Sequence, residues 1–169
     1  VGPRPLRFFE GSVYGPVLAP YDYQNCSGAR VAEVTWVGNS IGETPSVFHC
    51  YYNGGGAFLD AQQVEQSTVL GYFDNRPLNF PDEATYSWIT DSLKNRGAVS
   101  IVECCYGQGR AILLGCHPEI PPGLIRWQYR WSKDPYLKQL LPELEATNHE
   151  RLQLMRLMCE HLGLKTKSI

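Results

Sequence analysis

The chain has 169 residues, and its 15 Lys and Arg side chains nearly balance 17 Asp and Glu side chains, for a formal net charge of −2. This length fits one domain with its own hydrophobic core, so we expect residues 1–169 to form a single domain. No basic run suggests a nucleic-acid or anionic-membrane surface. No apolar stretch approaches the roughly 18–20 residues of a membrane helix. The chain starts at Val1 without a charged-then-apolar leader, so we expect a fragment or a processed product.

Cysteine usage favours reduced thiols and a cytoplasmic location. A domain large enough to have its own core does not need disulfides, although a disulfide is the alternative interpretation. No CxxC spacing supports zinc, so no metal site is expected. Adjacent cysteines along a strand should face opposite sides of the sheet. The six cysteines are Cys26, Cys50, Cys104, Cys105, Cys116 and Cys159.

Runs of β-branched and aromatic residues predict a strand-rich chain. Residues 11–20 contain two glycines and two prolines, which predicts a loop. Gly107-Gln108-Gly109 predicts a tight hairpin into a returning strand over 110–116, because glycine supplies the positive φ that such loops need. The other strand candidates cover residues 6–9, 29–37, 46–52, 57–59, 67–73 and 98–106.

Helices are expected to be few. Residues 86–93 fit either a helix or a short strand and turn, and residues 120–141, with three prolines, predict an irregular segment with a short helix over 136–141. Thr147 and Glu150 predict a capping box for a helix over 147–162, which Gly163 would end. Its apolar stripe would be Leu152, Met155, Cys159 and Leu162. A strand-rich chain with few crossover helices fits the second half of an α/β domain, where the last strands often form an antiparallel edge.

The most informative motif is His117-Pro118-Glu119, which follows a buried strand. A His and a carboxylate two residues apart form half of a nucleophile–base–orienter triad. The imidazole can take a proton from a thiol or hydroxyl, and the carboxylate can fix its tautomer. The alternative is an ordinary loop with a solvated carboxylate. Cys116 is a weak candidate nucleophile, because it lacks a Gly-x-nucleophile-x-Gly turn.

A second unusual segment follows the strand at 46–52. Consecutive glycines let the backbone approach a ligand or turn sharply, so the segment is either a cradle of backbone N–H groups or a strained turn. His49 and Cys50 point to opposite faces of a strand, which argues against a catalytic pair made from these two. The candidate ligand-binding loop is Tyr52, Asn53, Gly54, Gly55 and Gly56.

These residues resemble known families. Gly107-x-Gly109-Arg110-Ala111-Ile112-Leu113-x-Gly115-x-His117-Pro118-Glu119 resembles the end of class I glutamine-amidotransferase-like domains, where His-Pro-Glu completes a Cys–His–Glu triad. Within that superfamily, this run and two further segments are similar to the N-terminal domain of eukaryotic, notably fungal, biotin–protein ligases (holocarboxylase synthetases). The two further segments are residues 4–16 (RPLRFFEG followed by Gly15-Pro16) and residues 50–56 (CYYNGGG).

The resemblance implies an α/β, flavodoxin-like sandwich, of which this chain is the strand-rich C-terminal half with an antiparallel edge. It implies catalytic roles for His117 and Glu119, with the Cys in a missing first half of the domain. The parent ligase would use biotin and ATP to modify lysines of carboxylases, and no cofactor is expected in this segment. The expected partners are the missing half, the ligase catalytic domain and, through the parent, biotin-dependent carboxylases.

Three hypotheses follow for the function of the segment. In the first, it is a regulatory or interaction module of a biotin–protein ligase. This module is not catalytic alone, because Gly107–Arg110 is a hairpin turn and not the glycine-rich loop that binds biotinyl-adenylate in the catalytic domain of such ligases. Alternatively, it is part of an active Cys–His–Glu hydrolase or amidotransferase whose Cys lies outside the segment. The third hypothesis is a plain interaction domain with a fortuitous His-x-Glu.

Overall fold

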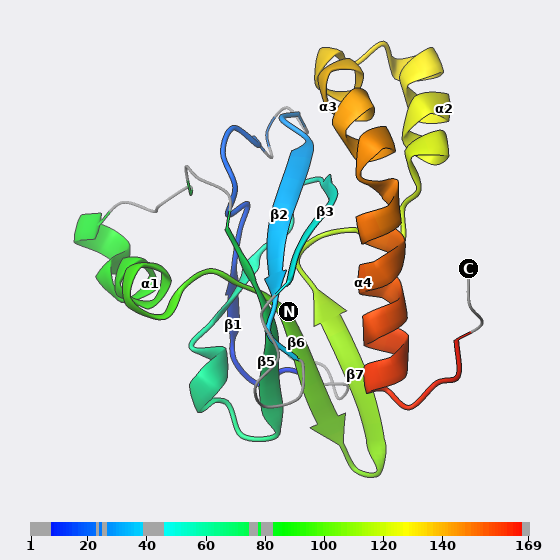
Figure 1. Ribbon diagram of the computed structural model, residues 1–169. Helices are drawn as coiled ribbons and strands as arrows, with labels where there is room; N and C mark the ends of the chain where they lie inside the picture. The colour runs from blue at the N-terminus through cyan, green and yellow to red at the C-terminus, as the bar shows by residue number, and fades with distance from the viewer. Residues whose placement is uncertain are drawn as a thin grey trace.

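An antiparallel five-stranded sheet of order β3-β2-β5-β6-β7 forms the centre of the molecule (Figure 1). The computed structural model describes residues 8–22, 24, 27–38, 46–74, 78 and 83–166. The sheet strands are β2 (Arg30–Trp36), β3 (Ser46–Tyr52), β5 (Ser67–Phe73), β6 (Val99–Tyr106) and β7 (Gly109–Leu114). A separate antiparallel pair consists of β1 (Ser12–Tyr14) and β4 (Ala57–Leu59).

The strand predictions from 29 to 116 are confirmed. Gly107 adopts a φ of +58° in the turn between β6 and β7, whose residues pair antiparallel as expected. The expected loop is confirmed for residues 15–20, but β1 occupies Ser12–Tyr14. The strand candidate over 6–9 is wrong for Phe8 and Phe9, which lie outside any strand, and its residues 6 and 7 lie outside the described residues. Phe9 instead packs edge-to-face on Phe58, with ring centroids 5.1 Å apart.

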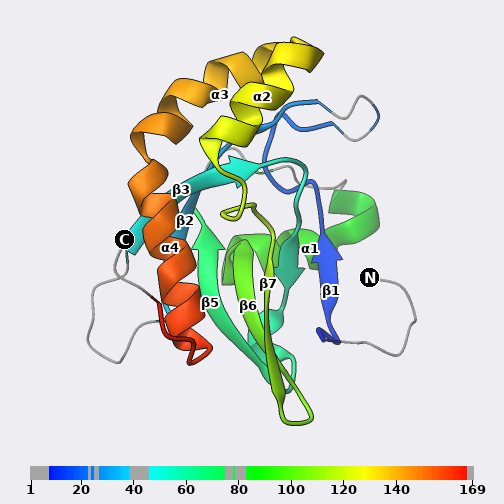
Figure 2. The same ribbon diagram turned by 90° about the vertical axis from the view of Figure 1, so that its right-hand side faces the viewer.

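Helices cover both faces of the sheet. The helix α4 (Asn148–His161) lies along β3, and α3 (Pro135–Ala146) packs on β2 and β3, with α2 (Pro122–Ser132) against α3. Figures 1 and 2 show α1 (Glu83–Arg96) and the β1–β4 pair on the opposite side of the sheet. The expected α/β class is therefore confirmed. Antiparallel pairing runs through the whole described sheet rather than only its edge, and the amidotransferase-like class stays a prediction.

The expected helix over 136–141 is confirmed as part of α3, but the expectation that the rest of 120–141 is irregular is wrong, because α2 and the start of α3 occupy most of it. Pro122 and Pro135 lie in the first turns of α2 and α3, where a backbone N–H has no partner within the helix. Asp134 caps α3 by accepting a hydrogen bond from the Tyr136 amide at 2.8 Å. Of the two alternatives for residues 86–93, the helix is correct. The prolines therefore mark helix starts rather than a loop.

The start of α4 also differs from the expectation. The Thr147 hydroxyl donates to the Glu143 carbonyl at 2.8 Å and makes no capping bond to α4, because Thr147 also ends α3. Glu150 turns away to His49, so the predicted capping box is wrong. The buried face is Arg151, Leu154 and Met158, whereas the predicted stripe of Leu152, Met155, Cys159 and Leu162 is only half-buried. Gly163 ends the helix as expected, with a φ of +80°.

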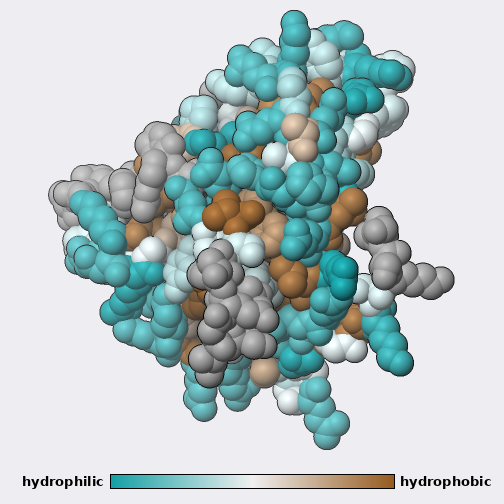
Figure 3. All heavy atoms as spheres, viewed as in Figure 1, coloured by the Kyte–Doolittle hydropathy of each residue, from teal (hydrophilic) through white to brown (hydrophobic). Residues whose placement is uncertain are grey.

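The main core lies between the sheet and α4 and continues to α1. Side chains of alternate β2 residues, Ala32, Val34 and Trp36, are buried there, as the period of two of a strand requires. Leu154 and Met158 of α4 contribute to the same cluster. On the face of the molecule seen in Figure 1, Figure 3 shows hydrophobic residues gathered over the middle and mostly hydrophilic residues around the α2–α3 end.

Gly55, Gly56 and Gly115 allow two backbone segments to pass each other without side chains between them. A Cβ built on Gly55 would overlap the carbonyl oxygen of Gly115, and a Cβ on Gly115 would overlap the carbonyl oxygen of Gly56. Gly15 extends the contact, because its Cβ would lie 2.7 Å from the Gly56 Cα. Any side chain at these positions would force the two backbones apart.

This crossing predicts that Gly55→Ala destabilises the protein by about 3 kcal/mol, since backbone cannot yield as a flexible side chain does. Gly123→Ala is the matched control: its Cβ would meet nothing within 4 Å, and in the exposed first turn of α2 it should stabilise the fold by up to about 1 kcal/mol. Urea unfolding measures both variants. Equal stabilities would show that the crossing imposes no constraint.

Candidate functional site

His117 and Glu119 lie just beyond the C-terminal end of β7, as predicted. The His117 amide donates to the Tyr51 carbonyl at 2.8 Å in an isolated antiparallel bridge, which fixes the backbone of the motif against β3. The imidazole Nδ1 lies 2.9 Å from the Glu119 Oε1 atom. When Nδ1 carries the proton that faces Glu119, Nε2 is the nitrogen that can accept a proton. The contact between the two side chains is confirmed, and their catalytic role stays a proposal.

The pair is accessible from outside the molecule. The side chains of His117 and Glu119 are 38% and 52% exposed, so a group from another segment or molecule can reach them. The Tyr51 ring lies beside the imidazole, with ring centroids 6.1 Å apart. Burial, assisted by the nearby Asp134 carboxylate, raises the pKa of Tyr51 to about 12, so its hydroxyl stays protonated at neutral pH.

The segment Tyr52–Gly56 lies next to the His117 motif, as expected, but its atoms are largely used in packing. The Tyr52 hydroxyl accepts hydrogen bonds from the amides of Val17 and Leu18 at 2.9 and 3.1 Å and donates to the Gly55 carbonyl at 2.6 Å. Gly54 has a φ of +80° and packs under the Tyr21 ring. Of the five residues Tyr52–Gly56, only Asn53 is exposed. The glycines are therefore explained by the backbone crossing, and a ligand-binding role stays a proposal.

A buried cation from α4 holds the middle of the motif. The Arg151 side chain donates through Nη1 to the Pro118 carbonyl at 2.7 Å and through Nε to the Asn148 Oδ1 atom at 2.9 Å. Arg151 is only 8% exposed, and burial lowers its pKa. The sequence alone does not single out Arg151, because an arginine on a helix is expected to be exposed to solvent. The signal was its position on the same helical face as Leu154 and Met158.

His49 forms an ion-pair contact with α4. This contact agrees with the expectation that His49 and Cys50 do not form a catalytic pair. The His49 Nδ1 atom lies 2.6 Å from the Glu150 carboxylate of α4. A second polar cluster lies on β6 and β7. Its buried Glu103 carboxylate lies 3.0 Å from Arg110 of β7 and 3.1 Å from His161 at the end of α4. The His49–Glu150 and His161–Glu103 contacts join α4 to the sheet, and the Arg110–Glu103 contact joins the neighbouring strands β7 and β6. Structural contacts therefore account for these residues.

Cys116 is a poor nucleophile in this structure. Its side chain is 1% exposed and lies beside the equally buried Cys50. The hydrogen bond to the Cys50 thiol, together with burial, raises the pKa of Cys116 well above its usual value. The cysteines that the structure describes are all free thiols, and Cys26 lies outside the described residues. Cys104 is buried and Cys105 exposed, as the alternation of a strand predicts.

The described part of the chain contains neither a candidate metal cluster nor a candidate membrane span. No group of three or more His, Cys, Asp or Glu side chains is arranged to hold a metal ion within the ranges given above. Among the same residues, no helix is both long and apolar enough to cross a bilayer. The turn between Gly107 and Arg110 is an exposed hairpin.

The fold and the site together define an α/β domain with a His–Glu pair just past the last strand of its sheet. A family model described as the N-terminal domain of biotin-protein ligase matches residues 1–169. The chain belongs to this family. It is 29% identical over 119 residues to the biotin–protein ligase of Schizosaccharomyces pombe (strain 972 / ATCC 24843), a match covering 70% of this chain and 16% of the ligase. The matched part is thus a small fraction of that ligase. No solved structure matches the chain.

The burial of Cys116 leads to a chemical prediction. Because alkylation requires the thiolate, a raised pKa lowers reactivity at neutral and mildly alkaline pH. In the folded protein at about pH 8, iodoacetamide should modify Cys105 and leave Cys50 and Cys116 unmodified, as followed by mass spectrometry of peptides. In denaturant, all three should react. Modification of Cys116 as fast as Cys105 in folded protein would restore Cys116 as a candidate nucleophile.

Proposed function

We propose that this domain is a regulatory or interaction module of a biotin–protein ligase. The parent enzyme would activate biotin with ATP and attach it to lysines of carboxylases. The observation that carries this proposal is the match of the family model over all 169 residues. The exposed hairpin at Gly107–Arg110 supports a non-catalytic segment, because a surface turn between two paired strands cannot enclose an adenylate. The free thiols support a cytoplasmic location.

An exposed aromatic face on α2 supports an interaction role. Leu124, Trp127 and Trp131 follow one another at spacings of three and four residues and are 48%, 56% and 75% exposed. The opposite face of α2 buries Pro122 and Ile125. Tryptophan is enriched among residues that dominate binding energy, and exposed apolar patches mark contact surfaces. We assign this face to contact with the ligase catalytic domain.

The second candidate function is a Cys–His–Glu hydrolase or amidotransferase, favoured by the 2.9 Å contact between His117 and Glu119. In this mechanism His117 takes the proton of a thiol through Nε2, and Glu119 holds Nδ1 and stabilises the imidazolium. The thiol comes from the first half of an amidotransferase-like domain, outside this segment. Tyr52, Asn53, Gly54, Gly55 and Gly56 would form the wall of this site next to Gly115.

Substitutions in the full-length ligase separate the two candidates. The interaction role predicts that His117→Ala leaves carrier biotinylation nearly unchanged. The double variant Trp127→Ala/Trp131→Ala should slow it about tenfold or more, because loss of a dominant interface residue costs about 2 kcal/mol or more. Trp88→Ala on α1 is the matched control, since Trp88 is 52% exposed on the other side of the sheet. Transfer of biotin to a carrier protein is the measurement.

A separate hydrolase or glutaminase assay tests the second candidate in the same proteins. If His117 is the base, its loss should reduce that activity about 10²–10⁴-fold. Severe loss of biotinylation from His117→Ala alone, in protein that stays folded, would overturn the interaction role. Equal effects of the Trp127/Trp131 and Trp88 substitutions would remove α2 as the contact surface.

A further inference from the structure

The tip formed by the end of α2 and the start of α3 carries a group of exposed cations beside the aromatic face of α2. The rings of Trp127 and Trp131 contact each other, with centroids 6.4 Å apart. Arg130 is three residues after Trp127, so the two side chains are neighbours on the helix surface. Lys133 is the residue that ends α2, directly after this aromatic pair. The cation group consists of Arg130, Lys133 and Lys138, all of which are exposed.

Lys138 belongs to this group through the way α2 and α3 pack. The Arg126 Nε atom donates to the Glu145 carboxylate at 3.1 Å, which fixes where the two helices face each other. Lys138 precedes Glu145 by seven residues, about two turns, and therefore lies on the same face of α3. The two helices run in opposite directions (Figure 2), so seven residues back along α3 correspond to seven residues forward along α2. The helix register thus places Lys138 level with Lys133.

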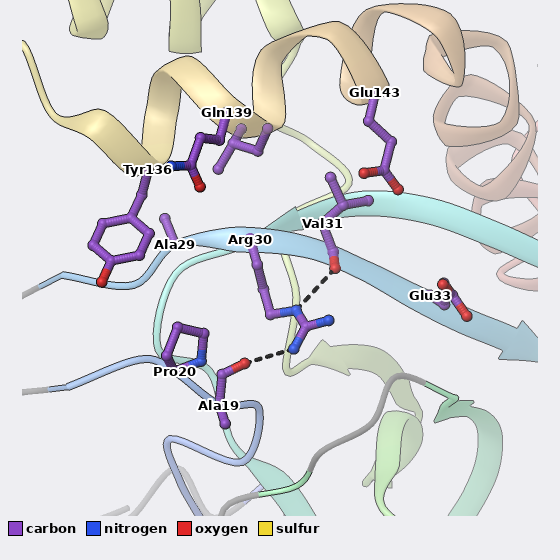
Figure 4. A pocket seen from close by; sticks show the side chains of 10 residues that line it. Ala19, Pro20, Ala29, Arg30, Val31, Glu33, Tyr136, Gln139 and Glu143 are labelled. Atoms are coloured by element: carbon purple, nitrogen blue, oxygen red, sulfur yellow. Dashed lines mark hydrogen bonds between the residues drawn. The ribbon is translucent and has the colours of Figure 1, made fainter.

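The positive charge of this tip is not neutralised by its surroundings. Within the described part of the chain, no carboxylate forms an ion pair with the cation group. Asp134 lies among the cations, but its carboxylate accepts from the Tyr136 amide as the cap of α3. Glu143 points toward Val31 of β2, on the sheet side of α3 (Figure 4). The negative end of α2 adjoins the positive end of α3, so their partial charges offset each other. Three cations therefore stand against one carboxylate.

We propose that α2 docks in an apolar groove of the ligase catalytic domain, with Asp and Glu side chains along the edge of the groove that faces the cation group. This inference rests on the proposed interaction role and adds the chemistry of the partner surface. Leu124, Trp127 and Trp131 form a ridge about 10 Å long, and an amphipathic helix places such a ridge in a groove. Carboxylates along one edge complement the cations and fix the direction in which α2 lies.

Carbodiimide cross-linking of the full-length ligase tests the proposal, because this reagent joins a lysine amine to a carboxylate only when the two groups are in contact. Mass spectrometry of peptides should show Lys133 or Lys138 linked to an Asp or Glu of the catalytic domain. The link should weaken in about 1 M NaCl, where the Debye length falls to about 3 Å. Lys165, exposed beyond the end of α4, is the internal control and should form no such link.

Three results would overturn the proposal: no link from Lys133 or Lys138, links confined to carboxylates of residues 1–169, or links to a second copy in a mixture of isotope-labelled and unlabelled ligase. Equal linking of Lys165 to the catalytic domain would do the same. If Trp127→Ala/Trp131→Ala still slows biotinylation in these cases, the interaction role stands and only the acidic groove is rejected. If that double variant has no effect, the interaction role fails as well.

A charge reversal tests the same contact in the biotinylation assay. Arg130→Glu in the full-length ligase should slow transfer of biotin to a carrier about fivefold at about 0.1 M salt, the effect of losing an exposed ion pair. The difference from the unmodified ligase should shrink at about 1 M salt, because screening removes the attraction and the new repulsion alike. Lys165→Glu, which makes the same change of charge, should have no effect. Equal rates at low salt, or a difference that salt does not change, would contradict the proposal.

Discussion

The close passage of Gly55 and Gly56 over Gly115 is the constraint on which the rest of the site depends. Since a Cβ on Gly55 or Gly115 would overlap backbone, the chain leaving β7 can approach the end of β3 only with glycine at these positions. The approach brings the His117 amide to the Tyr51 carbonyl at 2.8 Å. The His-Pro-Glu motif is therefore an extension of the sheet rather than a loose loop, and its side chains start from a fixed backbone.

Arg151 provides the second support, from the opposite direction. A buried guanidinium without partners would be strongly destabilising, but this one donates to the Pro118 carbonyl and to Asn148. The 2.6 Å contact between His49 and Glu150, one residue away on α4, joins the same helix to β3. The motif is thus held by β3 on one side and α4 on the other, while the His117 and Glu119 side chains stay accessible.

Local sequence patterns predicted the strands from β2 to β7 and the His117–Glu119 contact, because both depend on residues close together in the chain. Predictions failed where a residue had two possible structural roles. Pro122 and Pro135 suggested a broken segment but begin α2 and α3. Thr147 suggested a cap for α4 but bonds to Glu143. Arg151 and the Gly115 contact could not be predicted, because their partners Pro118 and Gly55 are 33 and 60 residues away in the chain, and single-sequence patterns carry no information on such pairs.

Native-state hydrogen exchange of the His117 amide tests the central claim most directly. If the glycine crossing and Arg151 hold the motif against β3, this amide should exchange only through large-scale unfolding, as slowly as the amides in the β2–β3 ladder. The amide of Gln108, in the exposed hairpin turn, provides the fast reference. Exchange of His117 as fast as that of Gln108 would contradict the account, because the motif would then be a flexible loop and not part of the sheet.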